Sequence, residues 1–166
     1  MFFRVKKIKG KEYAYIVEND WQSRGPRQKV KGYAGRVYRF IVGNNVNFSE
    51  YIKIENIQNY IEKNPKNRII QDLVEWELFR FGINKEEFLI DLNEIKLQRH
   101  RRNVVLLLND CFMCNSTLKD LLYFKPEGDE QTDGYRLAKA FVDAGIKVPQ
   151  EVFIGIFGKL YKSKFI

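Results

Sequence analysis

Two tyrosines stand one residue apart, directly after a run of lysines, in the stretch KKIKGKEYAYIV (residues 6–17). Aromatic rings stack on unpaired nucleic-acid bases, and lysine and arginine side chains bind phosphates. The spacing of Tyr13 and Tyr15 places both side chains on the same face of a β-strand. These residue types at this spacing predict a surface that contacts the bases and the backbone of a nucleic acid.

Positive charge is concentrated at the start of the chain. Residues 1–45 contain eleven lysines and arginines and three acidic residues, whereas residues 46–166 contain eighteen of each sign. The net charge of +8 therefore belongs to the first 45 residues. A clustered positive field attracts polyanions and accelerates their encounter with the protein. An alternative interpretation is a charged surface that serves solubility alone.

A tight turn at Lys9 and Gly10 predicts how the first two strands pair. Residues 2–8 and 11–17 are rich in β-branched and aromatic types, and glycine tolerates the positive φ of a two-residue hairpin turn. The predicted opposite pairs are Ile8 with Lys11, Lys7 with Glu12, Lys6 with Tyr13, Val5 with Ala14, Arg4 with Tyr15, and Phe3 with Ile16. Alternation then puts Phe3, Val5, Ala14 and Ile16 on an apolar face and Arg4, Lys6, Tyr13 and Tyr15 on the other.

A third segment, RQKVKGYAGRVYRF (residues 27–40), repeats the alternation and extends the same surface. The residues predicted to share that face are Arg27, Lys29, Lys31 and Tyr33, with Val30 pointing the other way. The connection NDWQSRGP (residues 19–26) is rich in turn-forming residues. It carries Trp21 and Arg24, which we expect to reach a ligand.

The candidate nucleic-acid-binding residues form two groups. The first group is Arg4, Lys6, Tyr13, Tyr15, Trp21, Arg24, Arg27, Lys29, Lys31, Tyr33 and Arg36. The second group is Arg99, Arg101 and Arg102, which surround His100 and extend the surface onto a helix. Alternatively, the tyrosines pack beneath later helices while the cations extend around them, and the arginines balance acids such as Asp91 and Glu94.

The pattern KGKEYAYIVENDWQSRGPRQKVKGYAGR (residues 9–36) resembles the short β module that opens many insertion-sequence (IS-element) transposases and some archaeal Fic-type proteins. That module reads approximately GKxYxYLVES followed by GKxRQxxxxYLGK. The matching positions are Tyr13, Tyr15, Val17, Glu18, Arg27, Gln28, Tyr33 and Gly35, whereas Ala34 replaces a leucine and Arg36 a lysine. The resemblance covers about the first 40 residues and implies an accessory nucleic-acid-binding element. Nothing after residue 45 resembles a transposase catalytic domain or a Fic histidine motif, so no activity carries over.

The remainder of the chain predicts a mostly helical domain at residues 46–166, joined to the basic antiparallel β module at 1–45 by the Gly/Asn-rich stretch VGNNVNF. The expected fold class is therefore α+β, a small N-terminal antiparallel β-sheet followed by helices. Apolar spacing and end signals predict helices over residues 50–63, 67–81, 117–124, 135–145 and 149–161, with Ser49 and Ser116 as the first and third N-caps. Residues 86–109 fit either one helix or strands, and we favour the helix.

Residues for catalysis or metal binding are few. Cys111 and Cys114 are the only cysteines and His100 is the only histidine, which is too small a set for a tetrahedral zinc site. We expect two buried, unpaired cysteines. The acids of helix 67–81, Asp72, Glu75 and Glu77, are expected on its solvated side. The sequence therefore predicts no cofactor, no metal and no catalytic residue.

These observations predict a non-enzymatic protein that binds DNA or RNA and whose helical part is a scaffold, a homodimer contact or a site for a protein partner. The first alternative is an adaptor, or a subunit of a larger complex, that docks an acidic protein. The second is a nuclease that uses Asp72, Glu75, Asp91 or Glu94. No stretch is apolar enough for a membrane span and the first ten residues lack a secretory signal, so we expect a cytoplasmic protein without membrane partners.

Overall fold

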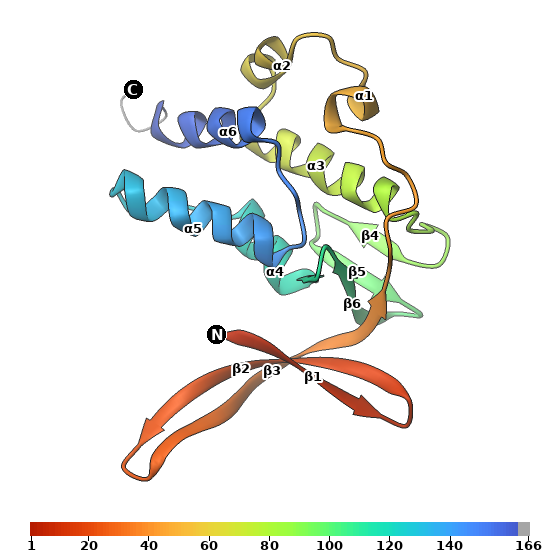
Figure 1. The fold of residues 1–166 in the computed structure, drawn as a ribbon, viewed down its shortest axis with the longest axis vertical. Helices are drawn as coiled ribbons and strands as arrows, with labels where there is room; N and C mark the ends of the chain where they lie inside the picture. Colours follow the sequence, from red (N-terminus) through yellow and green to blue (C-terminus); the bar gives the residue numbers. More distant parts are fainter. Residues whose placement is uncertain (163–166) are drawn as a thin grey trace.

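Three long strands at the start of the chain form a twisted antiparallel ribbon. They are β1 (Phe2–Ile8), β2 (Lys11–Gln22) and β3 (Gly25–Arg39). In Figure 1 of the computed structural model, which describes residues 1–162, this ribbon lies across the molecule below the helices. The opposite pairs predicted from the turn at Lys9 and Gly10 are all confirmed in the β1–β2 ladder. A two-residue turn thus sets the register of the first hairpin.

Two β-bulges change which face the earlier residues of β3 occupy. Lys31 and Ala34 have no opposite partner, and the register shifts at each of them. As a result Tyr33 lies opposite Tyr15, whereas Lys29 lies opposite Glu18. Because side chains alternate along β2, Tyr15 and Glu18 point to opposite faces. The common face predicted for Arg27, Lys29, Lys31 and Tyr33, with Val30 turned away from it, is therefore wrong.

The β2–β3 hairpin is longer than the sequence predicts. Residues 19–26 were expected to form a loop, but the ladder continues until Gln22 pairs with Gly25. The turn therefore consists of Ser23 and Arg24 alone. Every residue from 18 to 31 is exposed except Gly25, which is half-buried. We call residues 18–31 the arm.

Residues 86–109 form strands and not the helix that we favoured. The strands of this region are β4 (Leu89–Asp91), β5 (Lys96–Arg99) and β6 (Arg102–Leu108), and β7 (Cys111–Met113) follows. Their turns use positive φ at Ile95, His100, Arg101, Asn109 and Asp110, which a helix does not accommodate. β3 pairs in parallel with β6, which gives the sheet order β1-β2-β3-β6-β5-β4 with β7 beside β6. The α+β class is confirmed.

The helices lie near the predicted positions with two differences: the first predicted helix is divided, and the helix predicted at 135–145 begins at Glu130, five residues before its predicted start. They are α1 (Phe48–Ile52), α2 (Ile57–Lys63), α3 (Lys66–Arg80), α4 (Asn115–Leu122), α5 (Glu130–Asp143) and α6 (Gln150–Lys162). Lys53, with a φ of +57°, separates α1 from α2 inside the predicted helix 50–63. Asn47 and Asn56 cap these two helices in place of Ser49, and Cys114 caps α4 in place of Ser116.

Apolar side chains pack on both faces of the sheet. On one face, alternate residues of β6 such as Leu106 join the helices in the larger core. On the other face, the smaller cluster contains Ala14, Val37, Val105 and Cys114, with Phe3, Val5, Ala34, Leu107 and Phe112 packed against them. The ring of Phe3 stacks on that of Phe112 with centroids 5.0 Å apart. The apolar side of the ribbon therefore packs on β6 and β7.

Glu77 of α3 is fully buried, although the sequence places it on the solvated side of the helix. Its carboxylate accepts hydrogen bonds from the backbone N–H of Lys147 at 2.8 Å and from Nη1 of Arg80 at 2.9 Å. Burial raises the pKa of Glu77, while Lys147 and Arg80 oppose that shift. Because its donors come from α3 and from the segment before α6, Glu77 holds these two parts together.

Gly35 allows β3 to lie against the backbone of β6. Its φ is +142°, and a Cβ at this position would lie 2.5 Å from the carbonyl oxygen of Asn103. We expect Gly35→Ala to lower the free energy of unfolding by about 2–3 kcal/mol, because it adds backbone strain to this overlap. Urea denaturation measures the difference. Gly32→Ala is the matched control, since a Cβ there meets no atom within 4 Å. Equal losses in the two variants would contradict the importance of the close approach.

Candidate nucleic-acid interface

Three tyrosines meet on one face of the ribbon. The ring centroid of Tyr33 lies 5.4 Å from that of Tyr15 and 6.4 Å from that of Tyr13. Tyr33 is 54% exposed, and the other two are half-buried. The apolar clusters of the described residues contain none of the three, so these rings do not pack beneath the helices as the alternative interpretation supposed.

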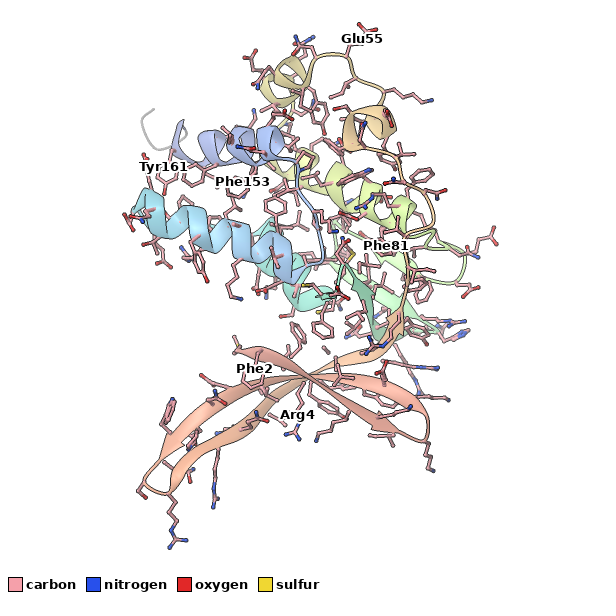
Figure 2. All side chains as sticks on the ribbon, in the orientation of Figure 1. Phe2, Arg4, Glu55, Phe81, Phe153 and Tyr161 are labelled. Atoms are coloured by element: carbon pink, nitrogen blue, oxygen red, sulfur yellow. The ribbon has the colours of Figure 1, made fainter. Side chains whose placement is uncertain are left out.

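Cations surround these rings. The Nζ of Lys6 lies 5.0 Å from the ring centroid of Tyr15, and Arg4 donates a hydrogen bond to Gln28 at 2.9 Å. Arg36 lies opposite Tyr13 in the ladder. Figure 2 shows Arg4 on the side of the ribbon turned away from the helices. We call Arg4, Lys6, Tyr13, Tyr15, Tyr33 and Arg36 the tyrosine face.

The acidic residues of the ribbon lie on the opposite face. Glu12, Glu18 and Asp20 occupy even positions of β2, whereas Tyr13 and Tyr15 occupy odd positions of the same unbulged strand. Alternation therefore separates every carboxylate of residues 1–45 from the tyrosines. The even and odd positions of these residues in the sequence already carry this signal.

Two of these carboxylates pair with cations of their own face. Glu12 accepts hydrogen bonds from Nε and Nη2 of Arg39 at 2.6 and 2.9 Å, and Glu18 lies 2.9 Å from Nζ of Lys31. Hydrogen bonds from Arg39 and Lys31 hold the pKa values of Glu12 and Glu18 below their usual range. These ion pairs neutralise cations of the far face and leave the charge of the tyrosine face in place.

The second basic cluster reaches the same surface from the β5–β6 turn. The guanidinium of Arg99 lies 5.1 Å from the ring centroid of Tyr38, and that of Arg36 lies 4.8 Å from it on the ribbon side. Burial and the nearby tyrosines raise the pKa of Tyr33. The positive charge of Arg102 opposes this rise. Pairing of β3 with β6 thus brings cations together that are about 60 residues apart in the sequence.

The structure corrects two expectations about this cluster. It lies on a hairpin and not on a helix, and His100 and Arg101 are exposed turn residues with positive φ. Arg99 pairs with Glu87 at 3.1 Å and not with Asp91 or Glu94. Arg101 stays at the turn with His100, where both line a groove near Lys85.

Five predicted binding residues lie on the arm, apart from the tyrosines. They are Trp21, Arg24, Arg27, Lys29 and Lys31. Trp21 is 79% exposed and occupies an odd position of β2, on the same side as Tyr15. Arg27 and Lys29 lie opposite Asp20 and Glu18 and therefore face the other way.

Tyr38, which was not among the predicted binding residues, is half-buried at the edge of this surface and packs against the larger core. Its ring lies between Arg36 and Arg99 and meets Phe88 edge to face at a centroid distance of 5.2 Å. Its position two residues after Arg36 was a usable signal, because alternation places the two side chains on one face.

The acids considered for a nuclease are engaged in local contacts. Asp72 accepts a hydrogen bond from the Tyr60 hydroxyl at 2.6 Å and pairs with Arg68 at 3.1 Å. Glu75 pairs with Lys85. Within residues 1–162, no group of three or more His, Cys, Asp or Glu side chains is placed to hold a metal ion.

Both cysteines are free thiols, as expected. Cys114 is buried at the start of α4, whereas Cys111 on β7 is only half-buried and so departs from the prediction. Burial raises the pKa of each thiol.

Comparison with known proteins gives no match among family models, curated proteins or solved structures. No helix in the described part of the chain is long and apolar enough to cross a bilayer.

We expect iodoacetamide to modify Cys111 of the folded protein faster than Cys114, because Cys114 is more deeply buried and only the thiolate reacts. Mass spectrometry of timed samples measures the two rates, and a sample in urea, where both thiols are accessible, is the control. Equal rates in the folded protein would place Cys114 at the surface.

Proposed function

We propose that the tyrosine face binds a single-stranded nucleic acid, with bases stacked on the tyrosines and phosphates bound by the surrounding cations. The observation that carries this proposal is the separation of charge across the ribbon. All three carboxylates of residues 1–45 lie on one face, and the tyrosines lie on the other among Arg4, Lys6 and Arg36. A phosphate approaching the tyrosine face therefore meets cations and no carboxylate of the ribbon.

The arrangement of rings supports stacking. Tyr33 lies within 5.4 Å of one tyrosine and 6.4 Å of another, so the three form a continuous aromatic surface. Stacking of a base on an aromatic side chain contributes about 1–3 kcal/mol and tolerates any base sequence. The resemblance of residues 9–36 to a transposase β module agrees with this proposal. The helical part serves as the scaffold, and binding without catalysis is proposed.

The proposal predicts that loss of two rings weakens binding of a labelled single strand. We expect Tyr13→Ala with Tyr15→Ala to raise the Kd by at least about tenfold, the effect of losing about 1.4 kcal/mol of stacking. Fluorescence anisotropy measures the Kd, and circular dichroism confirms that the fold is retained. The control is Tyr135→Ala, which removes an aromatic residue that is 72% exposed on α5. An unchanged Kd in the double variant would contradict the proposal.

A salt series tests which cations meet the phosphates. Four contacts, from Arg4, Lys6, Arg36 and Arg102, predict a slope of log K against log salt of about −3 for a single strand. We expect Arg4→Gln with Lys6→Gln to make this slope shallower by about 1.4. Arg27→Gln with Lys29→Gln removes the same charge from the opposite face and is the matched control.

The outcomes also separate this proposal from the adaptor. Equal salt slopes in the two charge variants would show that the overall positive charge of the protein attracts the nucleic acid and that no particular face binds it. Weak binding that is indifferent to the tyrosines would favour an acidic protein as the partner of this surface.

A further inference from the structure

The arm is a two-stranded ribbon that is solvated on both faces. Its backbone groups pair only between its own two strands, because β1 reaches no further than Val17 and β6 pairs only with Arg36–Arg39. In Figure 1 the arm ends at the β2–β3 turn, away from the helices. Isolated two-stranded hairpins are marginally stable in water. Most of the surface of the arm is therefore available to a ligand.

The cations of the arm lie at its tip and on one of its two faces. Arg24 lies in the turn, and Arg27 and Lys29 lie on the face opposite Trp21. Within the described residues, these three cations form no ion pair, whereas Lys31 pairs with Glu18. Glu18 and Asp20 reduce the net charge of the arm to +2. Cations at the tip and along one face suit a ligand that receives the end of the ribbon and has phosphates beside it, which a groove provides.

Trp21 is an isolated ring on the arm. It follows Tyr15 by six residues on the same side of β2, a separation of about 20 Å at the rise of a strand. Its 79% exposure and the absence of a ring partner among the described residues leave its faces open. A single ring does not form a stacking surface for successive bases, but its size and exposure suit contact with the end or groove of a stacked duplex.

The dimensions favour DNA. A two-stranded β-ribbon fits the major groove of B-form DNA, which is about 12 Å wide. The major groove of an RNA duplex is deep and narrow and does not admit one in this way. The distance of about 20 Å from Tyr15 to Trp21 corresponds to about six base-pair steps of a duplex at 3.4 Å each. One DNA molecule is therefore long enough to contact both the tyrosine face and the arm.

We infer that the ligand is DNA with a junction between single strand and duplex, in which the arm enters the groove of the duplex while the tyrosine face holds the single strand. This inference rests on the proposed function of the tyrosine face. It adds a second contact area and names the class of substrate.

The test compares four labelled probes: a single strand, a blunt duplex, the same DNA duplex with a single-stranded tail, and the tailed duplex made of RNA. We expect the tailed DNA to bind at least about tenfold more tightly than the single strand, because two linked contacts reinforce each other. Trp21→Ala with Arg24→Gln should remove this advantage and leave the single-strand Kd unchanged. Both residues are exposed, so the thermal midpoint should not move.

Each contrary result has its own meaning. Equal affinity for the single strand and the tailed DNA, or an arm variant that weakens both to the same degree, overturns the junction and leaves the proposed function standing. Equal affinity for tailed DNA and tailed RNA overturns entry of the arm into a B-form groove. Failure to bind any of the four probes overturns both the inference and the proposed function.

Discussion

The parallel pairing of β3 with β6 is the interaction on which the rest of the molecule depends. It joins only Arg36–Arg39 to Val104–Leu107, yet it carries the whole ribbon. Just before this pairing, the backbone of β3 also lies close to the backbone of β6, which Gly35 permits because it has no side chain. With β3 fixed, the apolar side of β1 and β2 packs on β6 and β7, and the tyrosines are left on the outer side. The cations of the β5–β6 turn then lie beside them.

Local signals were sufficient for part of the fold. The Lys9–Gly10 turn and strict alternation gave the β1–β2 register, and apolar spacing gave α3 and α6. The turns of the central region have Ile95, His100 and Arg101 at positive φ, where glycine is the usual residue. Because no glycine indicates these turns, the strands between 86 and 109 could not be predicted from turn residues. Buried Glu77 shows the same limit, since its partner Lys147 is 70 residues away.

The candidate site divides in the same manner. Tyr13, Tyr15 and the cations of β1 follow from alternation within one hairpin. The faces occupied by Arg27 and Lys29 do not follow from alternation, because each bulge in β3 shifts the register by one residue. No residue type in RQKVKGYAGR indicates where these bulges occur. The meeting of Arg99 and Arg36 at Tyr38 depends on a pairing between distant strands. The separation of the carboxylates from the tyrosines could be predicted from the even and odd positions of β2. Its relevance to binding depends on which face of the ribbon is buried, and only the structure shows that face.

The open edges of the arm have a consequence for how copies of this chain meet one another. An unpaired strand edge is a template for sheet growth between molecules. Here Pro26 supplies no N–H, Lys31 interrupts the ladder at a bulge, and the positive charges of Arg27 and Lys29 repel an identical edge. Three local features thus keep a solvated β-ribbon from assembling into a continuous sheet. Salt screens the repulsion but leaves the proline and the bulge unaffected, so the arm retains a barrier to edge-to-edge association even at high ionic strength.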